Sequence, residues 1–150
     1  MLLRKLPRNK SLQGSVFDAG LGFNKTNEEV NMGYRSDVGL CLNAKGKEAL
    51  DAALAEAEKT NEHFSMIKEL LDSASVRVST DDGAVAYHWE DLKWYADYSG
   101  VIFIENLLRN LDYHYYFFIR VGESDDDTEI HGGFWENPLG MCLVRGIAFD

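Results

Sequence analysis

Five acidic residues crowd a short stretch in the last third of the chain: Glu123, Asp125, Asp126, Asp127 and Glu129. Carboxylates at such spacing can bind calcium or magnesium, and the best-defined arrangement is the EF-hand loop. A loop beginning at Asp125 would need glycine at its sixth position, where the sequence has Ile130, although Glu136 suits the twelfth position. We therefore expect no dedicated metal site. Two other interpretations remain: a solvated hairpin tip that blocks edge pairing, and a surface that recognises a basic partner.

The other residue types that carry chemistry form no known catalytic pattern. The histidines lack the paired spacing of a zinc site: His63, His88, His114 and His131. Neither cysteine has a histidine beside it, and the chain has neither a GxSxG elbow nor a GxxxxGK[ST] phosphate loop. The sequence thus predicts no catalytic residue and no cofactor, and it favours a binding protein over an enzyme. A small metal-dependent enzyme or accessory protein that uses the acidic stretch is the alternative.

Aromatic and arginine side chains indicate a second part of a binding surface. Tyr34, Arg35, Trp94 and Tyr95 belong to the residue types that dominate the hot spots of protein interfaces. We expect these side chains and the five acidic residues to form a partner-binding site. Packing of the same aromatic rings in the core or at its rim is the alternative.

The charge of the chain narrows the class of partner. The formal net charge is −10, which argues against direct binding to a phosphate backbone and favours a protein partner with a basic surface. No apolar run approaches the roughly 18 residues of a membrane span. The basic N-terminus has no apolar segment and makes a poor secretion signal, so we expect a cytoplasmic protein. In that compartment Cys41 and Cys142 are expected to be free, buried thiols.

The pattern of apolar residues predicts elements that could position these groups. Strands alternate apolar and polar residues, helices repeat at spacings of three and four, and Asp81-Asp82-Gly83 is a strong hairpin turn. The long helix has a weak point at Thr60-Asn61, where it is expected to break or bend. The predicted elements are strand 32–43, helix 44–73, strands 75–80 and 84–94, helix 101–111, a hairpin across 113–135 with the acidic stretch at its tip, and strand 140–149.

This order predicts an α+β fold with a mostly antiparallel sheet and two helices on one face. The first six elements follow the β-α-β-β-α-β order of a ferredoxin-like sandwich, and the extra strands are C-terminal. Residues 32–150 would form this single domain. Residues 1–31 are expected to be an N-terminal extension, because Glu28-Glu29-Val30-Asn31 before Met32 matches a translated ribosome-binding sequence. An ordinary arm that packs on the domain is the alternative for residues 1–31.

From Met32 onward the chain resembles a family of small uncharacterised proteins of bacteriophages and prophages. The residues that carry the resemblance lie in five short runs: Gly33 to Val38, Lys93 to Tyr95, Phe103 to Glu105, Ile119 to Glu123 and Asp127 to Glu129, with Gly132-Gly133 beside them. The resemblance supplies no activity and no catalytic residue. It implies a protein of the bacterial cytoplasm that binds a host protein, with inhibition of a defence or nucleic-acid-handling complex as one form. A structural or assembly protein of the virion is the alternative.

Overall fold

The computed structural model describes residues 2–3 and 33–149 of the 150-residue chain. The predicted N-terminal extension, residues 1–31, lies outside the described residues except for Leu2–Leu3. That dipeptide is β1, which pairs in parallel with β7 (Cys142–Leu143).

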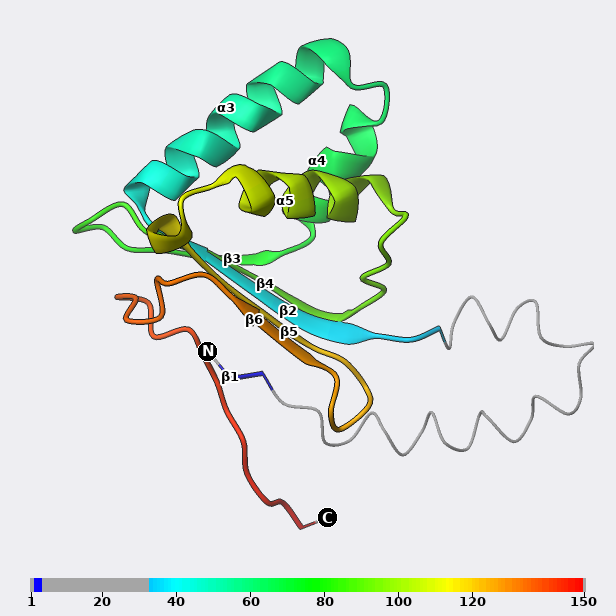
Figure 1. Ribbon diagram of the computed structural model, residues 1–150, viewed down its shortest axis with the longest axis vertical. Helices are drawn as coiled ribbons and strands as arrows, with labels where there is room; N and C mark the ends of the chain where they lie inside the picture. The colour runs from blue at the N-terminus through cyan, green and yellow to red at the C-terminus, as the bar shows by residue number, and fades with distance from the viewer. Residues whose placement is uncertain (1, 4–32, 150) are drawn as a thin grey trace, which may run out of the picture.

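A five-stranded antiparallel sheet forms the centre of the described part of the chain (Figure 1). Its strands are β2 (Ser36–Leu42), β3 (Ser75–Val78), β4 (Val85–Leu92), β5 (Tyr116–Val121) and β6 (Thr128–His131), in the spatial order β3-β4-β2-β5-β6. The first strand of the domain is therefore the central one, and it is buried along its whole length. A central strand of this kind needs small or apolar residues on both faces, which Gly39, Leu40 and Cys41 supply.

Three helices lie on one face of the sheet in the described residues (Figure 1): α3 (Ala44–Thr60), α4 (Phe64–Asp72) and α5 (Ser99–Asn110). Asn43 caps α3, because its side chain accepts a hydrogen bond from the Gly46 N–H at 2.8 Å. The predicted break at Thr60-Asn61 is confirmed, since Asn61 has extended backbone angles. The long predicted helix is thus two helices, and the prediction of two helices in total is corrected to three.

The sheet has a separate apolar cluster on each face. Under the helices, Val38, Leu40 and Phe118 pack with Leu50, Ile104 and their neighbours. On the opposite face, Cys41, Ile119 and Val121 pack with Met141, Phe134 and Leu139 of the C-terminal segment. Successive side chains along a strand point to opposite faces, so they pack in different clusters. This alternation is the reason that the strands could be predicted from the sequence.

The C-terminal third differs most from the prediction. Tyr113–Tyr115 forms a 3-10 turn, η2, so β5 begins at Tyr116; β6 ends at His131, where Gly132 has a φ of +93°. The predicted strand 140–149 is wrong beyond Cys142–Leu143, and those residues join β1 instead of the five-stranded sheet. Met141 is buried and packs with Phe134, Leu139 and Leu143 on the open face of the sheet, so this segment covers the sheet instead of extending it.

The α+β class is confirmed, whereas the exact ferredoxin-like order is not, because the first helix is divided and η2 precedes β5. Both cysteines are free, but only Cys41 is buried, and Cys142 is exposed. Burial, with the charge of Asp82 adding to it, raises the pKa of the Cys41 thiol to about 12. Among the described residues, every helix is too short or too polar to cross a lipid bilayer.

Candidate functional site

The structure brings three distant segments of the chain together at the tip of the β5–β6 hairpin: residues 34–35, 95–98 and 122–129. Their exposed side carries most of the residues that the sequence nominated for partner binding. We call this side the hairpin-tip surface, and it consists of Tyr34, Arg35, Tyr95, Tyr98, Glu123, Asp125 and Asp126.

Arg120 of β5 holds the acidic residues that follow the tip. Its side chain is mostly buried, and it donates from Nη2 to Asp127 Oδ1 at 2.6 Å, from Nη1 to Ser36 Oγ at 3.0 Å and from Nε to Glu129. Burial alone would lower the pKa of Arg120, but the hydrogen bonds to Asp127 and Glu129 outweigh it and raise this pKa. Arg120 stays charged, and Asp127 and Glu129 are bound inward to it.

Tyr34 joins the tip to the start of β2. Its hydroxyl donates to Asp127 Oδ2 at 2.6 Å and accepts from the Ser124 N–H at 3.0 Å. Gly122 makes this approach possible, because a Cβ atom at that position would clash with the Asp127 carboxylate and the Tyr34 hydroxyl. The tip is therefore tied to a residue about ninety positions earlier in the chain.

Arg35 makes a second connection to the tip. Its backbone N–H donates to Glu123 Oε1 at 2.8 Å, and its Nη1 donates to the Asp91 carbonyl at 3.2 Å. Asp91 has a φ of +57°, and its N–H donates to the buried Asp37 carboxylate at 3.1 Å. The end of β4 therefore lies beside the same surface as the tip.

Tyr95 and Tyr98 add an aromatic pair to this surface. Their ring centroids are 5.0 Å apart, and the Tyr98 ring is exposed. Burial raises the pKa of the Tyr95 hydroxyl; the charge of Tyr98 acts in the same direction and that of Arg35 in the opposite one. The two rings and the Arg35 side chain therefore lie close enough to share one contact surface.

Trp94 lies below this surface and not on it. Its side chain is 8% exposed and packs between Trp89 and Phe118, with centroid distances of 5.7 and 5.8 Å. The sequence nominated Trp94 as a contact residue together with Tyr95, but Trp94 is buried whereas Tyr95 is half-buried. Trp94 contributes to the core that supports the surface.

The sequence patterns did not nominate several residues of the site. Arg120 was not nominated, although an arginine flanked by apolar residues in a strand inside the sheet needs acidic partners. Ser36 and Ser124 carried no signal of their own. Tyr98 could have been found, because it stands just before a helix and is followed by apolar residues at helical spacing.

Metal binding by the acidic tip is not supported by this geometry. Asp127 and Glu129 are directed to the Arg120 guanidinium, so their oxygens do not converge on an open position. Across residues 2–3 and 33–149, no three His, Cys, Asp or Glu side chains are grouped so that they could hold a metal ion. Of the histidines near this hairpin, His131 lies opposite Phe118 in the β5–β6 pairing and His114 lies in η2.

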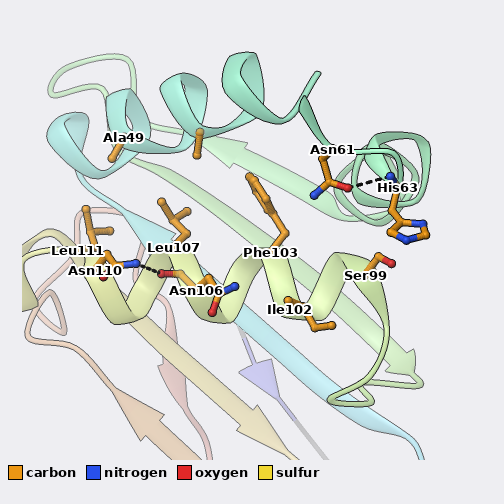
Figure 2. Close-up of a pocket in the computed structure, with 11 residues that line it drawn as sticks. Ala49, Asn61, His63, Ser99, Ile102, Phe103, Asn106, Leu107, Asn110 and Leu111 are labelled. Carbon is orange, nitrogen blue, oxygen red and sulfur yellow. Dashed lines mark hydrogen bonds between the residues drawn. The ribbon is translucent and has the colours of Figure 1, made fainter. Parts of the chain in front are cut away.

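A separate groove runs between α3 and α5 on the outer side of the helical layer (Figure 2). Figure 2 shows Phe103 and Leu107 of α5, and Leu111 directly after it, directed toward α3. The small residues Ala49 and Ala53 of α3 line the groove. His63 is the one ionisable residue among those that line the groove, and its backbone N–H donates to Asn61 Oδ1 at 2.8 Å. The groove therefore lacks the convergent ionisable groups that a reaction centre needs.

Comparison of the chain with protein-family models, with curated proteins and with solved structures finds no match.

Proposed function

We propose that the protein is a non-enzymatic protein of phage or prophage origin that binds a host protein through the hairpin-tip surface. The partner would present a basic surface to Asp125 and Asp126. Its place of action would be the cytoplasm of the bacterial host, and inhibition of a defence or nucleic-acid-handling complex would be its most specific form. The assignment to phage rests on the resemblance that begins at Gly33.

The observation that carries this proposal is the placement of three tyrosines beside an exposed acidic turn. Tyr34, Tyr95 and Tyr98 lie on the same surface as Asp125 and Asp126, and both aspartates are exposed. Tyrosine supplies contact area with few rotatable bonds, and acidic residues select a partner of opposite charge.

The way in which the tip is held supports the same proposal. Arg120 and Tyr34 fix the backbone of the tip before any partner arrives. A surface that is already ordered loses less conformational entropy on binding, so more of its contact energy appears as affinity. Asp127 and Glu129 are bound to Arg120 and are half-buried, whereas Asp125 and Asp126 are exposed in the turn.

Affinity capture with charge-matched variants tests the proposal. The wild-type chain, Asp125→Asn/Asp126→Asn and a control, Glu56→Gln/Glu58→Gln, are immobilised and exposed to a bacterial lysate. The control removes the same charge from exposed positions of α3. We expect a protein that the wild type and the control retain equally and that the tip variant retains about tenfold less, a loss that grows at low salt.

Quantitative mass spectrometry of the retained proteins is the measurement. Equal retention of every captured protein by all three chains would contradict the proposal, because the hairpin-tip surface would then contribute nothing to binding. Retention that falls equally in both variants would also contradict the proposal, since binding would then depend on the overall charge of the chain and not on this surface.

A further inference from the structure

A second exposed surface lies at the other end of the β5–β6 hairpin, away from the tip. It is a shallow cleft lined by Tyr113, Tyr116, Phe117, Ile130, His131, Gly132 and Trp135. Tyr113 and Trp135 are each 59% exposed, which is high for large aromatic rings in a well-packed domain. We call it the aromatic cleft.

Two glycines build the aromatic cleft. The Gly133 N–H donates to the Tyr113 carbonyl at 2.7 Å, and the Phe134 N–H donates to the Tyr116 carbonyl at 3.0 Å. A Cβ at Gly133 would meet the Tyr113 ring, and one at Gly132 would meet the Tyr116 carbonyl. Because these backbone bonds hold the segment after β6 against η2, the cleft is a fixed feature of the fold.

The C-terminal tail, residues 144–149, is complementary to such a cleft. Figure 1 shows the tail running away from η2 and from the helical layer. Ile147 is 89% exposed and Phe149 is 92% exposed, so both apolar side chains lie in solvent. In an extended chain residues two apart point to the same side, so Ile147 and Phe149 can enter one cleft together.

The charge of Arg145 supports the same pairing at one position. Arg145 is the charged residue within 144–149 and is exposed, and the acidic Asp150 follows Phe149 in the sequence. Exposed Asp112 directly precedes Tyr113, and exposed Glu136 directly follows Trp135, so acidic residues flank two of the lining residues. The lining itself contains no Lys or Arg that would repel Arg145.

We propose that the aromatic cleft of one copy of this chain binds the C-terminal tail of a second copy. Ile147 and Phe149 occupy the cleft against Tyr113 and Trp135, and Arg145 lies against Asp112 or Glu136. The exchange is reciprocal in a two-fold dimer, so each copy supplies one tail and one cleft. This interface is at the opposite end of the hairpin from the hairpin-tip surface and does not compete with it.

Sedimentation velocity of the full-length chain over a wide concentration range measures its association state and so tests this inference. We expect the wild type to dimerise. Two variants should dimerise only at a concentration about tenfold or more higher: a tail variant, Ile147→Ser/Phe149→Ser, and a cleft variant, Tyr113→Ala/Trp135→Ala. The tail positions are almost fully exposed, so their replacement leaves the fold intact. Ile102→Ser in the groove between α3 and α5 is the control, and its dimerisation should match the wild type.

Mixing the two variants separates this inference from loss of folding. The tail variant keeps an intact cleft and the cleft variant keeps an intact tail, so a mixture restores one of the two contacts. We expect the mixture to associate at a lower concentration than either variant alone. A wild type that stays monomeric, or a tail variant that dimerises like the wild type, would overturn the inference; so would a mixture no different from its components.

Discussion

The protein has two acidic hairpin turns, and they are held in different ways. In the β3–β4 turn, Asp82 Oδ1 accepts from the Ala84 N–H at 3.3 Å, and Ser79 N–H donates to the Ala84 carbonyl at 2.8 Å. All of these contacts lie within six residues. In the β5–β6 tip, Asp127 is bound by Tyr34, which is 93 residues away in sequence, and by Arg120.

This difference shows why acidic composition alone does not define a site. Both turns are rich in aspartate and exposed at their ends, so they look alike in the sequence. Within residues 33–149, the β5–β6 tip is the one of these two turns that is bound to distant parts of the chain and flanked by aromatic side chains. Replacing the long-range contacts should therefore affect the tip and leave the β3–β4 turn unchanged.

The largest effect is expected from Arg120→Met. This change leaves Asp127 and Glu129 without their cationic partner, and it should lower the free energy of unfolding by about 2 to 3 kcal/mol. The value is below that for a fully buried pair because Glu129 is partly exposed and solvent screens its charge. Urea denaturation followed by far-UV circular dichroism is the measurement.

Arg77→Met is the matched control for Arg120→Met. Arg77 lies in β3 beside the other acidic turn and is exposed, so its loss should change the free energy of unfolding by no more than about 0.5 kcal/mol. Equal destabilisation by the two changes would show that the two turns depend on arginine to the same extent.

A smaller effect is expected from Tyr34→Phe. The Asp127 carboxylate and the Ser124 N–H each lose one hydrogen bond, which should lower the free energy of unfolding by about 1 kcal/mol. Hydrogen exchange of the Ser124 amide should become faster while that of Ala84 stays the same. Tyr98→Phe keeps the ring beside Tyr95 and serves as the control; a faster Ala84 amide in Tyr34→Phe would contradict local action at the tip.

The smallest effect concerns the pH dependence of the β3–β4 turn. Hydrogen bonds from the Ser79 side chain and the Ala84 N–H hold the pKa of Asp82 below its ordinary value of 3.8. Because the pKa is lower in the folded state, the stabilisation is complete above 3.8 and is lost as pH falls through the folded-state pKa. NMR titration of the Asp82 carboxyl carbon should give a midpoint below 3.8. A midpoint at or above that value would show that the turn is not held by these local bonds.

Much of the fold was predictable because it depends on residues close together in sequence. Apolar alternation placed β2 and β4, apolar residues at helical spacing placed the start of α3 at residue 44, and Thr60-Asn61 marked its end. The C-terminal strand was not predictable in the same way. Met141 and Leu143 alternate as a strand would, but these residues pack on the open face of the sheet instead of extending it.

The candidate site was predictable in its residue types but not in its arrangement. The sequence singled out Tyr34, Arg35, Tyr95 and the acidic stretch separately, and it could not show that they meet. It also could not distinguish Trp94 in the core from Tyr95 at the surface, because burial depends on which side of the chain faces the sheet.

The sequence by itself determined the types of most elements up to β6, the apolar faces and the acidic turns, since these follow from backbone preferences and side-chain periodicity over a few residues. Only the tertiary structure decided that β2 lies between β4 and β5, and this order brings Tyr34 to Asp127 and Arg120 to Ser36. Contacts between residues this far apart form only when the sheet assembles, because no local pattern encodes which strands become neighbours.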